Sequence, residues 1–225
     1  SELNNFTPDY EWAISNGLGA IKTGLERRAS AAAGERKAFF NGAAMHIDAV
    51  LSLAEKYRDC ALKSGCMRLY EALRKVPYYG AEDYYEALVF MKILIYTMRA
   101  SRAHHVTMGR FDQYMYPYYL ASVKKGVTDD EIQELTELFF ISVNLDTDLY
   151  HGVQQGDNGQ SMVLGGRTAK SPDVYNRLSE IVLESSRRLC LIDPKINLRV
   201  DKNTPRDRFI KGTELTEQGL GFPQY

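Results

Sequence analysis

Helical spacing of apolar residues runs through most of this chain, and it is the feature that most limits the possible folds. The longest run covers residues 35–62 and repeats apolar residues every three or four positions: Phe39, Ala43, Ile47, Val50, Ala54 and Tyr57. That spacing places them on one face of a helix. Residues 8–19 and the stretch from Ile21 onward also have helical spacing. At 225 residues the chain is long enough to bury a core, so we predict a mainly α protein with a few short strands.

The most apolar helix is predicted over residues 81–102. Its densest part, residues 87–98, carries Lys92 and falls well short of the ~20 apolar residues that a membrane span requires. We therefore expect this helix to be buried inside the protein. The first ten residues are polar and lack the basic and apolar regions of a signal peptide. We expect a cytoplasmic location by default.

Several helix boundaries are marked by capping residues. Thr128 is followed three residues later by Glu131, the capping-box pattern, and then by an apolar face made of Ile132, Leu135, Leu138 and Phe139. The pairs 171–172 and 204–205 each place a Ser or Thr before a proline, which is typical of the first turn of a helix. Gly219 is the predicted end of the helix that begins near Thr204.

Strand signals are few and short. Residues 160–164 end at a pair of glycines, and residues 195–200 alternate apolar and polar side chains. A strand with one polar face cannot satisfy its own backbone groups and needs neighbours, and the chain offers few of them. No repeat or linker divides the sequence, so we expect one partial domain over residues 1–225.

Charge and cysteine content exclude several classes of protein. The 28 basic and 29 acidic residues give a net charge of -1, so no electrostatic reason favours a nucleic acid or an anionic membrane as partner. Cys60, Cys66 and Cys190 are an odd number without metal-type spacing. We expect neither a disulfide framework nor a bound metal.

The densest polar cluster, residues 104–114, follows the most apolar helix directly. It holds His104, His105, Arg110, Asp112 and Gln113, which would be costly to bury unless they are paired or face a cavity. A buried structural network is as good an interpretation of Arg110 and Asp112 as a functional one. The two histidines could carry protons or bind a ligand, although a histidine pair is more often structural.

Two further features stand out by their residue types. Residues 151–167 contain five glycines, among them Gly156, Gly159, Gly165 and Gly166, which allow close backbone approach. The order of these glycines matches no phosphate-binding loop, so nucleotide binding is not supported. Arg199 lies on the polar side of the strand predicted over residues 195–200.

The segment GRFDQYMYPYY, residues 109–119, resembles a signature of the glycyl radical enzymes of the pyruvate formate-lyase family, in their dehydratase and lyase branch. Weaker similarities support it. FTPDYEWAISNGLGAIK resembles the opening of the family's shared region, SMVLGG lies where the family has a turn with two glycines, and residues 193–225 are similar to the stretch that leads to the catalytic cysteine. The resemblance covers residues 6–225.

The resemblance implies a fold and a mechanism. Family members form an α/β barrel of two parallel half-barrels ringed by helices, and this chain would supply one half-barrel with its surrounding helices. A glycyl radical, installed by a radical-SAM activating enzyme, oxidises a cysteine on a central loop, and the thiyl takes hydrogen from the substrate. The full enzyme would be a homodimer that cleaves a C–O, C–N or C–C bond of a small polar substrate, with no bound cofactor besides the radical.

The resemblance also suggests roles for individual residues. The family often has His-Ser where this chain has His104 and His105, and the first two residues of that stretch face the substrate. We assign His104 as a proton donor or substrate hydrogen-bonding group, and His105 and Arg199 as substrate-binding residues. Arg110, Asp112 and Gln113 are assigned to a structural polar network. No residue is assigned to a metal.

The sequence contains neither the cysteine loop nor the glycine-radical motif of that family. None of its three cysteines occupies the position expected for the thiyl residue, so we expect this chain alone to be inactive. The alternative interpretation is a non-catalytic interaction or regulatory protein, or one half of a split enzyme, that uses the same fold.

Overall fold

The computed structural model describes residues 3–101, 103–145 and 159–225, without the side chains of residues 3–5 and of His104. Its chain contacts divide into two compact units. Unit 2 is continuous, residues 9–97, whereas unit 1 joins residues 1–8 to residues 98–225. We expected no boundary, because composition reveals a linker but cannot reveal that two distant segments pack together.

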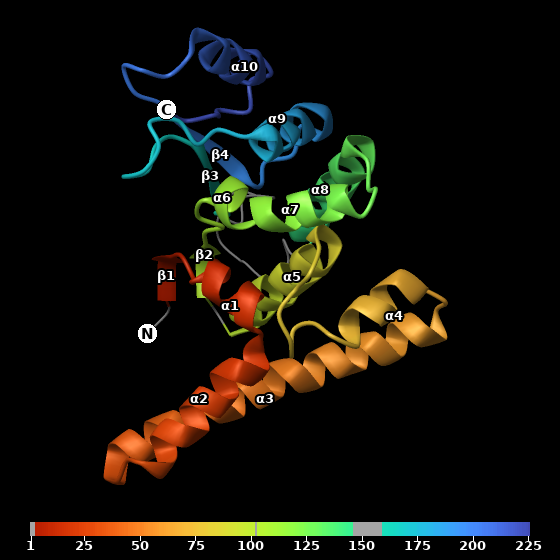
Figure 1. Ribbon diagram of the computed structural model, residues 1–225, viewed down its shortest axis with the longest axis vertical. Coiled ribbons are helices and arrows are strands. Elements are labelled where there is room, and N and C mark those ends of the chain that lie inside the picture. Colours follow the sequence, from red (N-terminus) through yellow and green to blue (C-terminus); the bar gives the residue numbers. More distant parts are fainter. Residues whose placement is uncertain (1–2, 102, 146–158) are drawn as a thin grey trace. The chain divides into compact units, whose positions relative to one another are not determined.

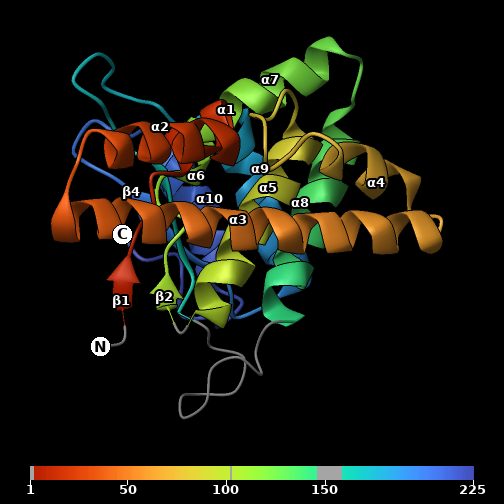
Figure 2. The same ribbon diagram turned by 90° about the horizontal axis from the view of Figure 1, so that it is seen from below.

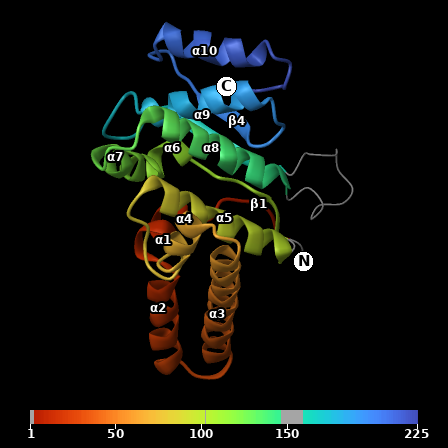
Figure 3. The same cartoon turned by 90° about the vertical axis from the view of Figure 1, so that its right-hand side faces the viewer.

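Unit 2 is helical. It contains α1 (Tyr10–Asn16), α2 (Leu18–Ser30), α3 (Gly34–Lys63), α4 (Met67–Leu73) and most of α5 (Tyr84–Ala100). Helix α2 lies alongside the long helix α3 (Figures 2 and 3). A small core joins Ala54, Leu73 and Ile93, from α3, α4 and α5. Helices α1, α2, α3 and α5 agree with those that the apolar spacing predicts, whereas α4 was not predicted.

Side-chain burial agrees with the prediction for α5 and agrees only in part with the prediction for α3. Helix α5 is lined with buried side chains, including Tyr84, Phe90 and Ile95 at 0% exposure, as its composition indicated. The face predicted on α3 is buried only in part, because Phe39 and Tyr57 are 70% and 41% exposed. The neighbours α2 and α4 bury mainly small residues of this helix, such as Ala44 and Ala61.

Unit 1 is built on a row of short parallel strands (Figure 1). Strand β1 (Leu3–Phe6) pairs with β2 (Ala103–Val106), with Phe6 opposite Val106. After β2 the chain turns to the next strand, β3 (Ser161–Gly165), which it contacts through a bridge from Gly109 to Met162. Strand β3 pairs with β4 (Lys195–Arg199), and β4 has a second neighbour at Gln224.

The helices of unit 1 cover this row of strands. They are α6 (Phe111–Tyr114), α7 (Tyr116–Lys124), α8 (Asp129–Asn144), α9 (Arg177–Leu189) and α10 (Arg206–Thr216). Helices α8 and α9 pack side by side (Figure 3). Apolar residues that alternate along β3 and β4 point into the core, with Met162, Leu164 and Ile196 at 0% exposure. A parallel row with helical connections is the arrangement that the half-barrel prediction requires.

Some helix boundaries in unit 1 differ from the sequence prediction. The capping box at Thr128 and Glu131 is confirmed, but Leu138 on the predicted apolar face is 53% exposed. Residues 171–172 begin no helix. Asn176 caps α9 instead, since its side chain accepts hydrogen bonds from the backbone N–H groups of Leu178 and Ser179. Helix α10 ends at Thr216, and Gly219 lies in the following turn with φ +76°.

Two of the strands were not predicted. Residues 103–106 form β2, where the sequence showed only a polar cluster after the apolar helix. Both β1 and β2 are four residues long, and their sequences, LNNF and AHHV, lack an alternating pattern. Such strands are stabilised by each other across a long stretch of sequence, so local spacing cannot reveal them. The strand over residues 195–199 has a neighbour on both sides, although the sequence offered few candidates.

Candidate functional site

The segment Gly109–Tyr114 connects the two strand pairs of unit 1. Gly109 has φ +57°, a conformation that favours glycine, and its carbonyl accepts a hydrogen bond from the Val163 N–H at 2.8 Å. The Met108 N–H donates to the Ser161 carbonyl at 2.7 Å, and the Tyr114 hydroxyl donates to the Met108 carbonyl at 2.6 Å. The polar signature is therefore fixed directly to strand β3.

Asp112 is the most deeply buried charged residue of this segment, at 0% exposure. Its Oδ2 accepts hydrogen bonds from the Gly165 N–H at 2.7 Å and from the Ser179 hydroxyl at 2.6 Å. Its Oδ1 is buried and accepts no hydrogen bond within the described part of the chain. Burial raises the pKa of Asp112, against the opposing effect of the hydrogen bonds from Ser179 and Gly165.

Arg110 and Gln113 bind the backbone on either side of the same turn. The half-buried Arg110 donates from Nη2 to the Gly165 carbonyl at 3.0 Å, and Gln113 donates from Nε2 to the Val174 carbonyl at 2.9 Å. Asn176, the cap of α9, donates to the Asp112 carbonyl at 2.8 Å. Arg110 and Asp112 thus meet at Gly165 through hydrogen bonds. The three residues assigned to a polar network all contact residues 165–174.

The turn after β3 is held in a conformation that suits glycine. Gly165 and Gly166 have φ +62° and +80°. A Cβ on Gly166 would lie 2.8 Å from the Cβ of Arg199, so the Arg199 side chain packs directly over this turn. This position of Arg199 follows from the register of β3 and β4, in which Arg199 lies opposite Gly165.

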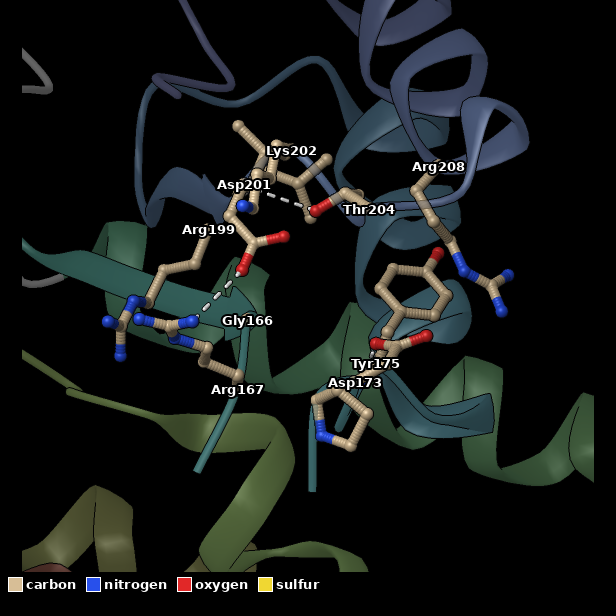
Figure 4. A pocket seen from close by; sticks show the side chains of 12 residues that line it. Gly166, Arg167, Asp173, Tyr175, Arg199, Asp201, Lys202, Thr204 and Arg208 are labelled. Carbon is tan, nitrogen blue, oxygen red and sulfur yellow. Dashed lines mark hydrogen bonds and ion pairs between the residues drawn. The ribbon is translucent and has the colours of Figure 1, made fainter. Parts of the chain in front are cut away.

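A pocket of about 420 Å³ opens beside this turn, at the carboxyl ends of β3 and β4 (Figure 4). Its residues come from the ends of both strands, the loop before α9 and the start of α10. The charged and polar side chains that line it are those of Arg167, Asp173, Tyr175, Arg199, Asp201, Lys202, Thr204 and Arg208. In parallel sheets, ligands commonly bind at this end of the strands. Sequence reasoning found only Arg199 among these residues, because the others lie in connections without a strong motif.

His105 has a backbone conformation that is rare for its residue type. It lies in β2 with φ +53°, and its ring packs against Gly159, where a Cβ would overlap the imidazole. Such conformations persist where the surrounding structure holds them, and they are concentrated at functional sites. His104, the preceding residue of β2, lies opposite Asn4 of β1. The side chain of His104 lies outside what the structure describes, as do residues 151–158 of the glycine-rich segment, including Gly156.

The structure does not bring all the predicted site residues together. The bridge from Gly109 to Met162 places His105 level with the region before β3, whereas Arg199 lies opposite Gly165 at the far end of that strand. At ~3.3 Å per residue, the two positions are roughly 20 Å apart along the strand direction. Arg199 instead lines the pocket at the carboxyl ends of β3 and β4.

The described residues show neither a cluster of metal ligands nor a membrane-spanning helix. Within residues 3–101, 103–145 and 159–225, no cluster of three His, Cys, Asp or Glu side chains has the arrangement of a metal site. Cys60, Cys66 and Cys190 are each exposed as free thiols. No helix in the described ranges is long and apolar enough to cross a bilayer.

Comparison with known proteins identifies the class to which this fold belongs. Residues 1–225 match the family described as pyruvate formate lyase-like. The isethionate sulfite-lyase of Bilophila wadsworthia is 24% identical over 96% of this chain and 29% of its own length. The 4-hydroxyphenylacetate decarboxylase glycyl radical subunit of Clostridioides difficile is 28% identical over 74% of this chain and 19% of its own length.

A solved structure supports the same fold. The glycerol-bound form of the B12-independent glycerol dehydratase from Clostridium butyricum superposes with a TM-score of 0.88, at 22% identity, over 98% of this chain and 31% of that one. The chain therefore belongs to the pyruvate formate lyase-like family and has the fold of part of its barrel, as the GRFDQY segment indicated. It spans about a third of the length of the relatives it matches.

Proposed function

We propose that this chain forms the substrate-side half-barrel of a glycyl radical lyase or dehydratase that acts on a small polar molecule. The relatives support this, since those compared include a sulfite-lyase, a decarboxylase and a dehydratase. The observation that carries the proposal is the His104–His105 pair in β2. It lies in a parallel row of strands whose next connection is fixed by the polar network of Arg110, Asp112 and Gln113.

The proposed roles of the radical and the two histidines follow from the chemistry of elimination. The radical, installed by a radical-SAM activating enzyme on a glycine that this sequence does not contain, would supply hydrogen abstraction through a cysteine thiyl. His104 would then donate a proton to the leaving group as its bond breaks, which suits an imidazole near neutral pH. His105, held by Gly159, would orient the substrate. We also propose that the full enzyme is a cytoplasmic homodimer.

The histidine assignment is tested in the complete enzyme. His104→Gln should lower kcat by ~100-fold or more, as expected when a general acid is lost. His105→Ser should mainly raise KM, because a residue that orients the bound substrate contributes to its binding. Radical content should stay at the wild-type level in both variants, measured by electron paramagnetic resonance beside steady-state kinetics.

The control is His46→Gln, which replaces an exposed histidine on α3. It should leave kcat, KM and radical content unchanged. If His104→Gln and His105→Ser both form the radical and keep the wild-type kcat/KM, the two histidines are structural and the proposed roles are wrong.

A second prediction concerns the chain by itself. The 225-residue chain contains no segment that matches the cysteine loop or the glycine motif of the family. Treated with a radical-SAM activating enzyme, reductant and S-adenosylmethionine, it should show no organic radical by electron paramagnetic resonance. A doublet signal from this chain would contradict the proposal that the radical glycine lies outside it.

A further inference from the structure

The pocket at the carboxyl ends of β3 and β4 has an excess of positive charge. Four cationic side chains line it, those of Arg167, Arg199, Lys202 and Arg208, against the carboxylates of Asp173 and Asp201, and Arg208 also pairs with Glu180 and Asp207 outside the lining. Figure 4 shows Arg167 and Arg199 on one side of the space, Asp201 and Thr204 along another, and Tyr175 with Arg208 on the side opposite the first. A volume of about 420 Å³ suits a small organic ligand.

The two carboxylates offset only part of this charge, and each also accepts a hydrogen bond within its own turn. Asp173 accepts a hydrogen bond from the Tyr175 N–H at 2.9 Å, and Asp201 accepts one from the Asn203 N–H at 2.8 Å. Asp201 makes one longer ion pair, at 3.7 Å, with Arg167. Within the described ranges, Arg199 and Lys202 have no ion-pair partner.

Tyr175 adds an independent observation. Its hydroxyl is buried and makes no hydrogen bond among the residues that the structure describes. The Arg208 guanidinium lies over its ring, with 4.2 Å between the guanidinium carbon and the ring centre, and this fixes the ring at the pocket wall. A buried hydroxyl without a partner costs folding free energy, so its retention at the wall of a pocket that also holds Arg199 and Lys202 points to a ligand.

The dipole of helix α10, which begins beside the pocket, has the direction that favours an anion there. Helix α10 begins at Arg206, two residues after the lining residue Thr204, and no side chain caps it. Its first turn therefore presents the positive end of the helix dipole near the pocket, with the acidic Asp207 in the same turn. Cations, a hydroxyl donor and a helix start on the same side of the strands favour an anionic oxygen group.

We propose that this pocket binds a small ligand with an oxyanion head group, held by Arg199, Lys202 and the Tyr175 hydroxyl. The pocket lies at the opposite end of β3 from His105, so the proposal does not depend on the radical chemistry. Arg199, which the sequence placed at a substrate site with the histidines, belongs to this pocket. A carboxylate, sulfonate or phosphate would each supply the required oxygens.

Isothermal titration calorimetry on the 225-residue chain tests the proposal, with acetate, methanesulfonate and inorganic phosphate as probes and glycerol as the neutral comparison. At least one of the three anions should bind, more weakly as sodium chloride is added, and glycerol should not. The anion with the highest affinity identifies the head group. If none of the three anions binds to the folded chain, the proposal is wrong.

Variants locate the binding. Arg199→Gln and Lys202→Gln should each weaken binding of the best probe by about tenfold, as expected for a lost charge-assisted hydrogen bond. The matched controls Arg28→Gln and Lys37→Gln remove the same charges from exposed positions in unit 2 and should change the affinity less than twofold. Equal losses in all four variants would show nonspecific attraction and overturn the proposal.

Tyr175→Phe separates binding from folding. Because the hydroxyl has no partner in the described structure, its removal should leave Tm unchanged or raise it when no anion is present. The same variant should bind the best probe several-fold more weakly. If Tyr175→Phe binds that probe as tightly as the wild type, the hydroxyl is not a ligand group and this assignment fails.

Discussion

Replacing Gly80 by alanine should destabilise unit 2 by about 3 kcal/mol or more, a cost at the upper end of overpacking in a well-packed region. A Cβ at this position would overlap the backbone carbonyl oxygen of Ser15. Backbone cannot move aside as the end of a flexible side chain can. The chain on each side is also fixed, since the Ala81 N–H donates to the Ile14 carbonyl at 2.9 Å and the Gly19 N–H donates to the Tyr78 carbonyl at 2.9 Å.

Gly17→Ala should be at least as damaging, because its Cβ would overlap the Tyr78 carbonyl oxygen and its φ of +83° disfavours any side chain. Gly24→Ala is the matched control. It lies inside α2 with no atom within 4 Å of the added Cβ, and it should stabilise by roughly 0.5–1 kcal/mol. Urea unfolding followed by circular dichroism compares the three variants. Equal midpoints for Gly80→Ala and Gly24→Ala would contradict the close contact.

The second large effect is expected at Asp112. Asp112→Ala should cost roughly 3–5 kcal/mol, because it leaves the Gly165 N–H and the Ser179 hydroxyl buried without their acceptor. Asp112→Asn keeps one acceptor oxygen of nearly the same shape, so it should cost much less. Urea unfolding of the two variants beside the wild type measures the difference.

The pH dependence of the same variants provides an independent test. Burial raises the pKa of Asp112 in the folded state above its value in the unfolded chain. The stability that the protonated group contributes is therefore fully present below the unfolded-state pKa, and it is lost as pH rises through the folded-state pKa. The asparagine variant cannot ionise. Its stability relative to the wild type should improve from acidic to neutral pH, and a constant difference would refute the raised pKa.

Local sequence patterns predicted the elements that are stabilised within themselves. The capping box at Thr128, the apolar helix α5 and the alternating strand β4 each carry their signal in adjacent residues, and the structure places each near its expected position. The strands β1 and β2 carry no such signal. They form because residues 3–6 and 103–106 meet in the folded chain.

The candidate sites show the same division. One continuous segment holds the histidine pair and the network of Arg110, Asp112 and Gln113, so their residue types alone identified them as candidate site residues. The pocket at the carboxyl ends of β3 and β4 combines four separate segments, and its members Tyr175 and Lys202 belong to no motif. Only the parallel register of β3 and β4 reveals that Arg199 lies over Gly166 and away from His105.

The interruption of unit 1 by residues 9–97 determines the order in which the protein can assemble during synthesis. Strand β1 leaves the ribosome before unit 2, but its partner β2 emerges only after all of unit 2. Unit 2 can begin to fold from contacts within its own continuous segment, whereas the strand row must wait for contacts between distant segments, which form slowly. The nascent chain therefore carries an unpaired β1 strand until residues 103–106 have been made, and in that interval the edge is open to wrong partners.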